Sequence, residues 1–515
     1  MATYALSYAE VSRPFMVFIL VALALSTVWI YRQFFHPLAK VPGPTLARYT
    51  GLWRDWQYFK GNWHDVVLDL HAKYGRVVRV APDELSLVDE KAMKRIYGHG
   101  TGNNSPKTEW YSTWHIPKTG PGLFATQNQK EHAFLRKRVA GAYSMTTILK
   151  GEEIIQRCFD LLFEKLKEHS NEVVDMSEWT NAVAYDVVGE LAYGEQLGHL
   201  KTETDVMGVQ KAIFDGFIMM GTLGHFKYLG RGQTLNRPSV GKITKLLGIP
   251  NAFANFRQWS VGRINDRRKN PVARHDMLNH FLQMKTKDGR PASDGEVLIE
   301  AMNIVGAGAD TTSIGMRACL YYICSNPLTY RKLQAELDEY FRDRETKGIS
   351  ASQGSPYNEI RQLPYLHAVI SEATRLHPSI VWQLLRKAPP DLIIDGFTIP
   401  PGTNVGISPR AQNRDPDIWG EDANEFRPER WVEDEEKAKY FENITMTFGG
   451  NGPRMCIGRN IALVEMHKYI AQLLYNFDVQ LVDPSRPWHI TTYWFAYQHE
   501  MKVRVKVREG RMITT

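Results

Sequence analysis

Cysteine is scarce in this sequence, and the few cysteines do not form pairs. The 515 residues include only Cys158, Cys319, Cys324 and Cys456, and no two of them make a Cys-x-x-Cys motif. This spacing argues against a disulfide framework and against a zinc site, and it is typical of a chain that folds in a reducing compartment. Cys319 and Cys324 fall within one helical pattern, where we expect buried packing residues.

Linkers, internal repeats and blocks of like charge are also missing. After the first fifty residues no such stretch divides the chain, so one large domain is favoured over the roughly two to four that length alone suggests. The composition is globular, with 43% hydrophobic and 23% charged residues. The formal net charge of +7 is small for this length, and no nucleic-acid motif accompanies it. An acidic protein partner, an anionic membrane surface or no specific role would each explain it.

Only one long hydrophobic run is present, at residues 15–31. Its seventeen uncharged residues would form about 26 Å of helix, near the lower limit for crossing a bilayer. A cleaved signal peptide is the competing interpretation, but the run is long for one and no small-x-small cleavage site follows it. Arg32, Lys40 and Arg48 follow instead, which favours a cytosolic location for the rest of the chain, although Arg13 on the other flank weakens this.

These patterns predict four segments. Residues 1–14 form a short luminal N-terminus, 15–31 a transmembrane signal anchor, 32–48 a proline-rich hinge, and 49–515 a cytosolic domain. On the cytosolic side, the glycosylation sequons at Asn103 and Asn443 would not meet the glycosylation machinery.

Helical patterns dominate the large domain, and strands are short. Residues 77–80 and 85–88 predict an early hairpin, and 392–399 predict a second hairpin closed by an Asp-Gly turn. A polar stretch at 101–127, rich in glycine and proline, is predicted to be a long functional loop. Most of 132–341 is patterned for helix. The predicted fold is therefore mainly α with small β-sheets.

The segment from Thr447 to Arg459, TFGGNGPRMCIGR, carries the clearest chemical signal. Its glycines and proline favour a tight, irregular backbone just before Cys456, and an apolar stripe at helical spacing follows. Cys456 is therefore expected at a helix N-terminus, where backbone N–H groups and the helix dipole favour thiolate over thiol. A lone cysteine in such a loop is usually a buried packing residue, but the surrounding pattern favours a metal ligand.

This segment resembles the haem-binding signature of cytochromes P450, F-G-x-G-x-R-x-C-x-G. The matching positions are Gly450, Gly452, Arg454, Cys456 and Gly458. The resemblance implies that Cys456 is the thiolate ligand of the iron of haem b, and that Arg454 contacts a haem propionate. One position differs from the signature. Where the signature has its phenylalanine, this chain has Gly449, and Phe448 lies one residue earlier. Either the loop shifts so that Phe448 still shields the sulfur, or the shielding is looser.

A second motif lies in the helical pattern at 300–324, where the string AGADTT (residues 307–312) places small residues in mid-helix. Thr311 follows Ala307 by four residues, so its hydroxyl can bond the Ala307 carbonyl and help open a groove for dioxygen or water. Close packing between two helices would also explain the small residues. The string resembles the family's [A/G]-G-x-[D/E]-T-[T/S] motif, which implies that Thr311 is the oxygen-side alcohol and Asp310 the proton-delivery acid.

Glu372 and Arg375 lie three residues apart on one predicted helix face, which alone suggests an ordinary surface salt bridge. The pair resembles the family's E-x-x-R motif, and Arg430 lies in a matching P-E-R segment. This implies a buried triad of Glu372, Arg375 and Arg430 that holds the haem-side chain.

His132 and Arg136 match the family's W/H-x-x-x-R positions, whose side chains contact haem propionates. A solvated basic helix face is the alternative. Arg386 is a weaker propionate candidate than Arg454.

The resemblance covers nearly the whole large domain and implies a monooxygenase. Such an enzyme inserts one atom of dioxygen into an apolar small molecule and releases the other as water. Electrons are expected from NADPH through a separate, membrane-bound cytochrome P450 reductase, since no flavin or iron–sulfur segment is present. The N-terminal segment resembles fungal microsomal members, which implies the endoplasmic reticulum membrane. The WFAYQ string at 494–498 resembles the pisatin demethylase-like branch and suggests secondary metabolism.

Substrate contacts are expected from the 101–127 loop, Ile304, residues 380–385, Trp494 and Phe495, although these aromatic residues could equally belong to the core. Two alternatives keep the fold. One is an isomerase or dehydratase acting on a hydroperoxide or similar substrate, against which the Asp-Thr pair argues. The other is a non-catalytic haem sensor, which the long access loop makes less favoured. NADPH-dependent turnover and substrate-induced spectral shifts would separate these functions.

Overall fold

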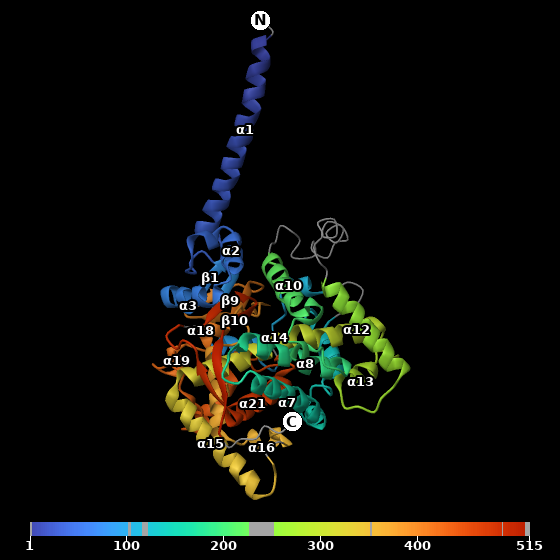
Figure 1. The fold of residues 1–515 in the computed structure, drawn as a ribbon. Coiled ribbons are helices and arrows are strands. Elements are labelled where there is room, and N and C mark those ends of the chain that lie inside the picture. Colours follow the sequence, from blue (N-terminus) through green and yellow to red (C-terminus); the bar gives the residue numbers. More distant parts are fainter. Residues whose placement is uncertain are drawn as a thin grey trace.

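The computed structural model describes residues 3–100, 105–115, 122–225, 252–350, 353–486 and 488–509. A long helix, α1 (Thr3–Ile30), projects from a rounded, mostly helical body (Figure 1). The predicted mainly-α fold with small sheets is confirmed. Asn103 and parts of the predicted 101–127 loop lie outside the described residues.

The apolar N-terminal segment is longer than the sequence pattern predicts. α1 begins well before residue 15, and a π-helical turn, η1 (Tyr31–Phe35), continues it. The apolar part covers Phe15–Phe35, 21 residues with a mean hydropathy of 2.0, and none of it is buried against the body. By length and composition this helix can cross a membrane.

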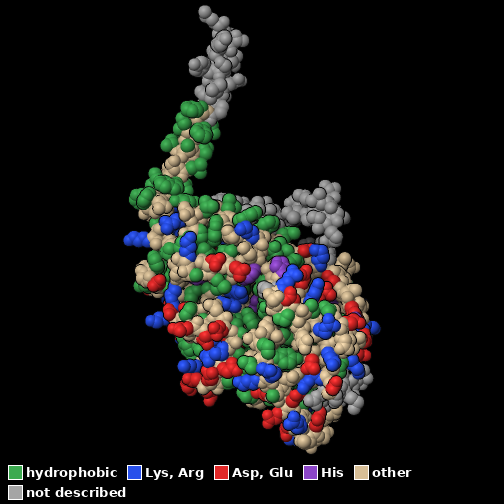
Figure 2. Space-filling view, turned by 60° about the vertical axis from the view of Figure 1, so that its left-hand side comes forward, with side chains coloured by type: hydrophobic (Ala, Val, Ile, Leu, Met, Phe, Trp, Pro, Cys, Tyr) green, Lys and Arg blue, Asp and Glu red, His purple; other side chains and the backbone are tan. Residues whose placement is uncertain are grey.

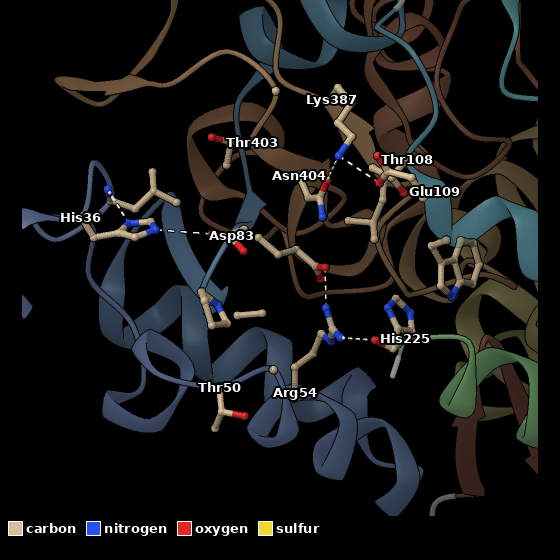
Figure 3. Close-up of a pocket in the computed structure, with 18 of the residues that line it drawn as sticks. His36, Thr50, Arg54, Asp83, Thr108, Glu109, His225, Lys387, Thr403 and Asn404 are labelled. Atoms are coloured by element: carbon tan, nitrogen blue, oxygen red, sulfur yellow. Dashed lines mark hydrogen bonds and ion pairs between the residues drawn. The ribbon is translucent and has the colours of Figure 1, made fainter. Parts of the chain in front are cut away.

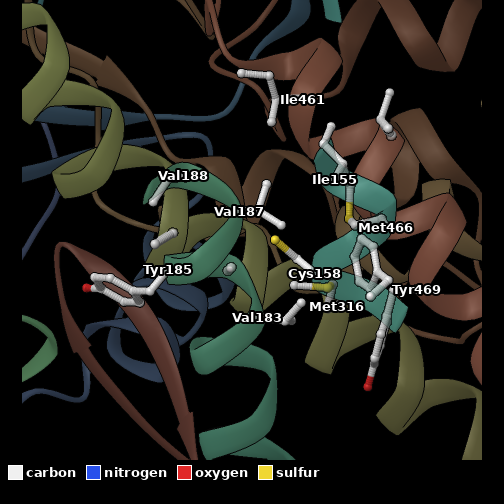
Figure 4. Packing of buried hydrophobic residues seen from close by; sticks show 14 of the residues in the cluster. Ile155, Cys158, Val183, Tyr185, Val187, Val188, Met316, Ile461, Met466 and Tyr469 are labelled. Carbon is white, nitrogen blue, oxygen red and sulfur yellow. The ribbon is translucent and has the colours of Figure 1, made fainter. Parts of the chain in front are cut away.

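The centre of the body is a bundle of long helices. α8 (Met176–Tyr193) packs along α14 (Asp294–Ser325) and also contacts α7 (Glu152–Glu168). α14 contacts α21 (Arg459–Asn476) and α17 (Pro364–Leu376) as well. Figure 4 shows the buried side chains between them, including Cys158, Val187, Met316 and Tyr469. α14 begins at Asp294, six residues before the predicted start.

A capping box explains this early start of α14. The Ser293 hydroxyl accepts from the Glu296 backbone N–H, and the Glu296 carboxylate accepts from the Ser293 N–H. On the same helix Cys319 is buried as expected, whereas Cys324 is only half-buried.

The strands form small sheets at the edges of the bundle. One sheet has the order β1 (Val77–Ala81), β2 (Glu84–Leu87), β7 (Asn404–Ile407), β4 (Arg386–Lys387). The others pair β5 (Leu392–Ile394) with β6 (Phe397–Ile399), β9 (His489–Tyr493) with β10 (Phe495–His499), and β11 (Lys502–Val507) with β3 (Val173–Asp175) and β8 (Phe477–Leu481). Both predicted hairpins are present.

The remaining helices cover the bundle and connect the sheets. They are η2 (Thr45–Arg48), α2 (Leu52–Lys60), α3 (Trp63–Tyr74), α4 (Glu90–Tyr97), η3 (Glu109–Trp114), α5 (Gln129–Val139), α6 (Met145–Lys150), α9 (His199–Thr202), η4 (Val206–Gly208), α10 (Val209–Leu223), α12 (Ala252–Lys269), α13 (Met277–Leu282), α15 (Pro327–Thr346), α16 (Tyr357–Ile360), α18 (Pro409–Gln412), α19 (Pro416–Trp419), η7 (Pro428–Trp431) and α20 (Glu435–Ile444). The predicted 101–127 loop thus contains a short helix, η3, that carries two tryptophans.

Candidate functional site

The loop before Cys456 is held by backbone contacts. Gly449 and Gly450 have φ values of +83° and +79°, a region that side chains disfavour. A Cβ on Gly452 would lie 1.8 Å from the Tyr97 carbonyl oxygen, so only glycine fits there. α21 begins three residues after Cys456. The local sequence therefore places the cysteine at the start of this helix, as its glycine pattern indicates.

Cys456 is exposed and lines a cavity of about 220 Å³ between the cysteine loop, the end of α5 and the start of α21. Surrounding protein raises the pKa of the thiol, while the Gly458 and Arg459 backbone N–H groups and the charge of Arg136 lower it. In the protein without a bound metal, the effect of burial on the pKa of Cys456 is larger than that of the backbone N–H groups and Arg136, so the thiol form is favoured. The position near a helix N-terminus is therefore not enough to give the expected thiolate. A bound metal cation would reverse this balance, since a coordinating thiol is deprotonated.

Phe448 stays beside the cysteine despite the shifted signature. Its carbonyl accepts a hydrogen bond of 3.0 Å from the Cys456 backbone N–H. The Arg459 guanidinium lies over its ring, 5.8 Å from the centroid. A side chain on Gly449 would instead meet Leu384 at 3.1 Å in a strained backbone conformation. The loop therefore accommodates phenylalanine at position 448 and requires glycine at position 449.

The middle of α14 presents an open face. The Thr311 hydroxyl donates to the Ala307 carbonyl at 2.7 Å, and Ala307 is exposed although it lies in mid-helix. A Cβ on Gly306 would meet no atom within 4 Å, whereas one on Gly308 would contact Val188 of α8. The small residues therefore have two roles. Gly306 leaves one face of α14 open, and Gly308 lets the opposite face pack closely against α8.

Asp310 points away from solvent and is held by two phenols. Its carboxylate accepts hydrogen bonds from the Tyr185 hydroxyl at 3.0 Å and the Tyr497 hydroxyl at 2.8 Å. Burial raises the pKa of Asp310 to about 6, although the two hydrogen bonds act in the opposite direction. Among the described residues, no basic side chain forms an ion pair with it. A carboxyl group with this pKa can both give and take a proton near neutral pH.

Glu372 is the hub of a buried ion network. It accepts from Arg375 at 2.7 and 2.8 Å, from Arg430 at 2.8 Å and from the Trp431 indole at 2.9 Å. Neither Glu372 nor Arg375 is exposed. Burial would raise the pKa of Glu372, but the hydrogen bond and charges of the two arginines outweigh it and lower the pKa. The carboxylate is therefore charged and fully partnered.

The Arg375 guanidinium also organises the chain that follows. It donates to the Asn413 carbonyl at 2.5 Å and to the Ala423 carbonyl at 2.7 Å, and lies 4.8 Å from the Trp419 ring centroid. The segment leading to the cysteine loop is thus tied to α17.

Five basic side chains gather beside the cysteine loop. They are Lys107, His132, Arg136, Arg386 and Arg454. Burial and the charges of the other four lower the pKa of His132 to about 3, so it is neutral. Among the described residues, no carboxylate pairs with any of the five. The Nε atoms of Arg386 and Arg454 are buried without a hydrogen-bond partner. This cluster presents positive charge that nothing around it balances.

Lys107 and Tyr111 of this region were missed by the sequence analysis. The Lys107 ammonium lies 4.4 Å from the Tyr111 ring centroid, and the Tyr111 hydroxyl accepts from Arg386 at 2.8 Å. Burial and the charges of Arg386 and Arg454 lower the pKa of Lys107 well below its ordinary value. A lysine in a polar loop gives no local signal, and only the fold brings it to the cluster.

The predicted substrate-side residues form part of one aromatic cluster. Trp494 lies 4.8 Å from Trp110 of η3 and 6.1 Å from Trp382, measured between ring centroids. Phe495 lies 4.3 Å from Phe217 of α10, a helix that the sequence analysis did not single out. Ile304 is buried separately in the helical core.

A second cavity, of about 490 Å³, lies at the base of the N-terminal helix (Figure 3). Its wall includes Arg54 of α2, which is paired with two buried carboxylates, Asp55 and Glu84. Lys387 bonds Asn404 and Glu109 on the opposite wall, as Figure 3 shows. The charged lining distinguishes this cavity from the aromatic cluster.

Comparison with known proteins gives a consistent result. The family model described as "Cytochrome P450" matches residues 41–507. The chain is 32% identical to cytochrome P450 monooxygenase cicH of Emericella nidulans, covering 95% of this chain and 97% of the relative. It is 34% identical to cytochrome P450 monooxygenase gsfF of Penicillium aethiopicum, covering 93% and 95%. It is also 32% identical to a pisatin demethylase of Fusarium vanettenii, covering 94% and 92%. The chain therefore belongs to the cytochrome P450 family.

Proposed function

We propose that this protein is a membrane-anchored haem-thiolate monooxygenase. It inserts one atom of dioxygen into an apolar small molecule, with electrons from NADPH through a separate cytochrome P450 reductase. The relatives named monooxygenases support this reaction class. Because these relatives and the pisatin demethylase come from fungi, we also propose a step in fungal secondary metabolism.

The residues around Cys456 fit haem b. Cys456 supplies the iron ligand, and the unbalanced cations suit the two haem propionates. Arg386 and Arg454 have buried donors without partners, which is the condition that an anionic group would relieve. His132 and Arg136 of α5 complete the propionate side, together with Lys107.

Thiolate-ligated haem, when bound, supplies the activation of dioxygen. The protein's part is to deliver protons and to control water. The Thr311 hydroxyl, which bonds the Ala307 carbonyl, is at the open face of α14 and can orient a water or hydroxyl there. Asp310 is the proton source, since its carboxyl group is close to half protonated near pH 6.

The aromatic cluster supports an apolar substrate. Trp110, Trp382, Trp494 and Phe495 are buried and offer large apolar ring faces for stacking. The indole N–H groups of Trp110 and Trp382 have no hydrogen-bond partner among the described residues, so a substrate with a polar group could also accept from them. Asp310 and Thr311 also argue against the isomerase alternative, which needs no proton-delivery pair.

Exposed apolar side chains near the N-terminus support membrane attachment. Apolar side chains cover the anchor and continue onto the body near its base (Figure 2). They include Phe35, Leu46, Trp56 and Phe59, which are 72%, 61%, 57% and 57% exposed. Such side chains around a single span suit the interface of a bilayer. We propose the endoplasmic reticulum membrane, with residues 49–515 on the cytosolic side.

The observation that carries the proposal is Cys456 beside the unbalanced cation cluster. The test is expression with a cytochrome P450 reductase in a host without related activity, with NADPH, ¹⁸O₂ and a panel of fungal terpenoids, polyketides and alkaloids. Mass spectrometry should find products carrying one ¹⁸O atom, and the Cys456→Ala variant should form none. Products that form without NADPH and without ¹⁸O would favour the isomerase instead.

A further inference from the structure

The hairpin β9–β10 turns on a single strained residue. Tyr493 pairs directly with Phe495, so Trp494 alone makes the turn. Its φ is +79°, a left-handed conformation that is unfavourable for a bulky residue. Backbone strain of this kind persists where the surroundings fix it. Here the surroundings are aromatic rings, because Trp494 is 3% exposed and lies against Trp110 and Trp382.

The same strand reaches the acid of α14. Phe495 and Tyr497 point to the same side of β10, with ring centroids 5.9 Å apart. Phe495 contacts Phe217 in the aromatic cluster, and the Tyr497 hydroxyl donates to Asp310 at 2.8 Å. One strand thus connects the proposed substrate side with the proposed proton source.

A second link joins β10 to Thr311. The Ala496 backbone N–H donates to the Ser379 carbonyl at 2.9 Å, and the Ser379 hydroxyl donates to the Thr311 carbonyl at 2.7 Å. Further along, Gln498 donates to the Ile314 carbonyl at 3.0 Å and accepts from Arg317 at 2.9 Å. The Ala496 carbonyl also accepts a hydrogen bond from His377 at 3.0 Å, and Phe495 forms an isolated β-bridge with Ile380. The strand is therefore fixed at Ala496 and at Gln498, and Tyr497 lies between these two positions.

The other phenol that holds Asp310 has no such connection. Tyr185 belongs to α8, is fully buried, and packs within the helical core. Its hydroxyl donates to the second oxygen of the same carboxylate at 3.0 Å. Two tyrosines thus make equivalent hydrogen bonds to Asp310, one from a packed helix and one from the hairpin.

We propose that Tyr497 is a positioning residue through which the β9–β10 hairpin couples occupancy of the aromatic cluster to the protonation of Asp310. The proposal rests on the proposed monooxygenase function. A ligand that enters the cluster has to move rings that are already packed, and we propose that it moves the hairpin tip with Trp494 and Phe495. Tyr497 follows the fixed Ala496 directly, so displacement of the tip pulls on Tyr497 through Ala496 and lengthens the hydrogen bond from Tyr497 to Asp310.

Loss of this hydrogen bond favours the protonated acid. A donor to a carboxylate stabilises its charged form, so a weaker bond leaves burial to raise the pKa of Asp310 further. The other groups that face Asp310 are Tyr185 of α8, Arg317 of its own helix and Asp205 before η4. None of them belongs to the hairpin, so they do not follow the tip. The acid would then be loaded with its proton when substrate is present.

The experiment is an infrared pH titration of the Asp310 carboxyl band in the full-length holoprotein. It uses naphthalene as the probe, whose flat apolar ring can stack on the tryptophans of the aromatic cluster. Quenching of tryptophan fluorescence reports that the probe is bound. The Asp310→Asn variant assigns the band. In the wild-type protein the probe should raise the midpoint by about half a pH unit or more, roughly a threefold change in proton affinity.

The matched variants are Tyr497→Phe and Tyr185→Phe, which each remove one hydroxyl donor to the same carboxylate. Both should raise the midpoint without the probe. Only Tyr497→Phe should lose the probe-dependent shift, and Tyr185→Phe should keep it. A wild-type protein without a shift, or two variants that behave alike, would overturn the coupling. The titration needs no turnover, so a failed monooxygenase assay would be recognised separately.

Discussion

Glu372→Ala is the substitution for which the structure allows the clearest prediction. The Glu372 side chain is completely buried and accepts four side-chain hydrogen bonds, from Arg375, Arg430 and Trp431. It also accepts the Arg427 backbone N–H at 3.0 Å. The alanine variant would leave two guanidinium groups in the interior without their shared carboxylate.

The magnitude follows from the burial of the network. Breaking a buried ion pair by removing one partner costs about 3–5 kcal/mol, since the remaining charge stays desolvated. Among the described residues Arg375 forms an ion pair only with Glu372, whereas Arg430 also keeps its ion pair with Asp422 at 3.2 Å, so we expect a loss within that range. Whole domains are stable by only about 5–15 kcal/mol. Arg375 also holds the carbonyls of the chain before the cysteine loop, so we expect the loss to appear first as failure to retain haem.

The assay combines haem content per polypeptide, from absorbance, with thermal unfolding followed by circular dichroism. The control is Glu435→Ala, which removes an exposed ion pair with Lys439 and should leave both measurements unchanged. A Glu372→Ala protein with normal haem content and unchanged Tm would refute the reasoning.

Three further substitutions test other parts of the site. Cys456→Ser should abolish the red-shifted Soret band of the reduced carbon monoxide complex and the activity, and a retained band would contradict thiolate ligation. Asp310→Asn should lower turnover yet stabilise the fold at pH 7 by up to roughly 3 kcal/mol, because burial raises the pKa from its ordinary 3.8 to about 6. In the wild type, the cost of burying the charged Asp310 carboxylate is absent below pH 3.8 and reaches its full value above about pH 6. The Tm of the variant should therefore exceed that of the wild type at neutral pH, and this difference should vanish at acid pH. Lys107→Met should stabilise the haem-free protein by relieving repulsion from Arg386 and Arg454, but speed haem loss to apomyoglobin, and faster loss without the stabilisation would point to a packing defect instead.

The sequence predicted those features that depend on residues close together in the chain. The glycine loop before Cys456, the small residues around Asp310 and the Glu372–Arg375 pair each lie within a short window, and local geometry follows from local spacing. The family and the mainly-α fold are confirmed. The segment boundaries near the membrane and the catalytic roles of the site residues stay predictions.

Contacts between distant segments could not be predicted in the same way. Tyr185 and Tyr497 reach Asp310 from elements far apart in sequence, and nothing in their own neighbourhoods marks them. Lys107 joins the cation cluster only because its segment bridges to Arg386. The cavity at the base of the anchor likewise depends on several segments meeting. Such contacts depend on how distant segments pack together, and local residue patterns do not reveal this.

The close approach of Gly452 to the Tyr97 carbonyl limits how the proposed iron ligand, Cys456, can move. It joins one backbone to another, so no choice of rotamer on either side can relax it. Any side chain at 452 would push the loop away from α4 and carry the sulfur with it. The main chain therefore fixes where the Cys456 sulfur lies, and its electron density can be changed only through the groups that bond the sulfur.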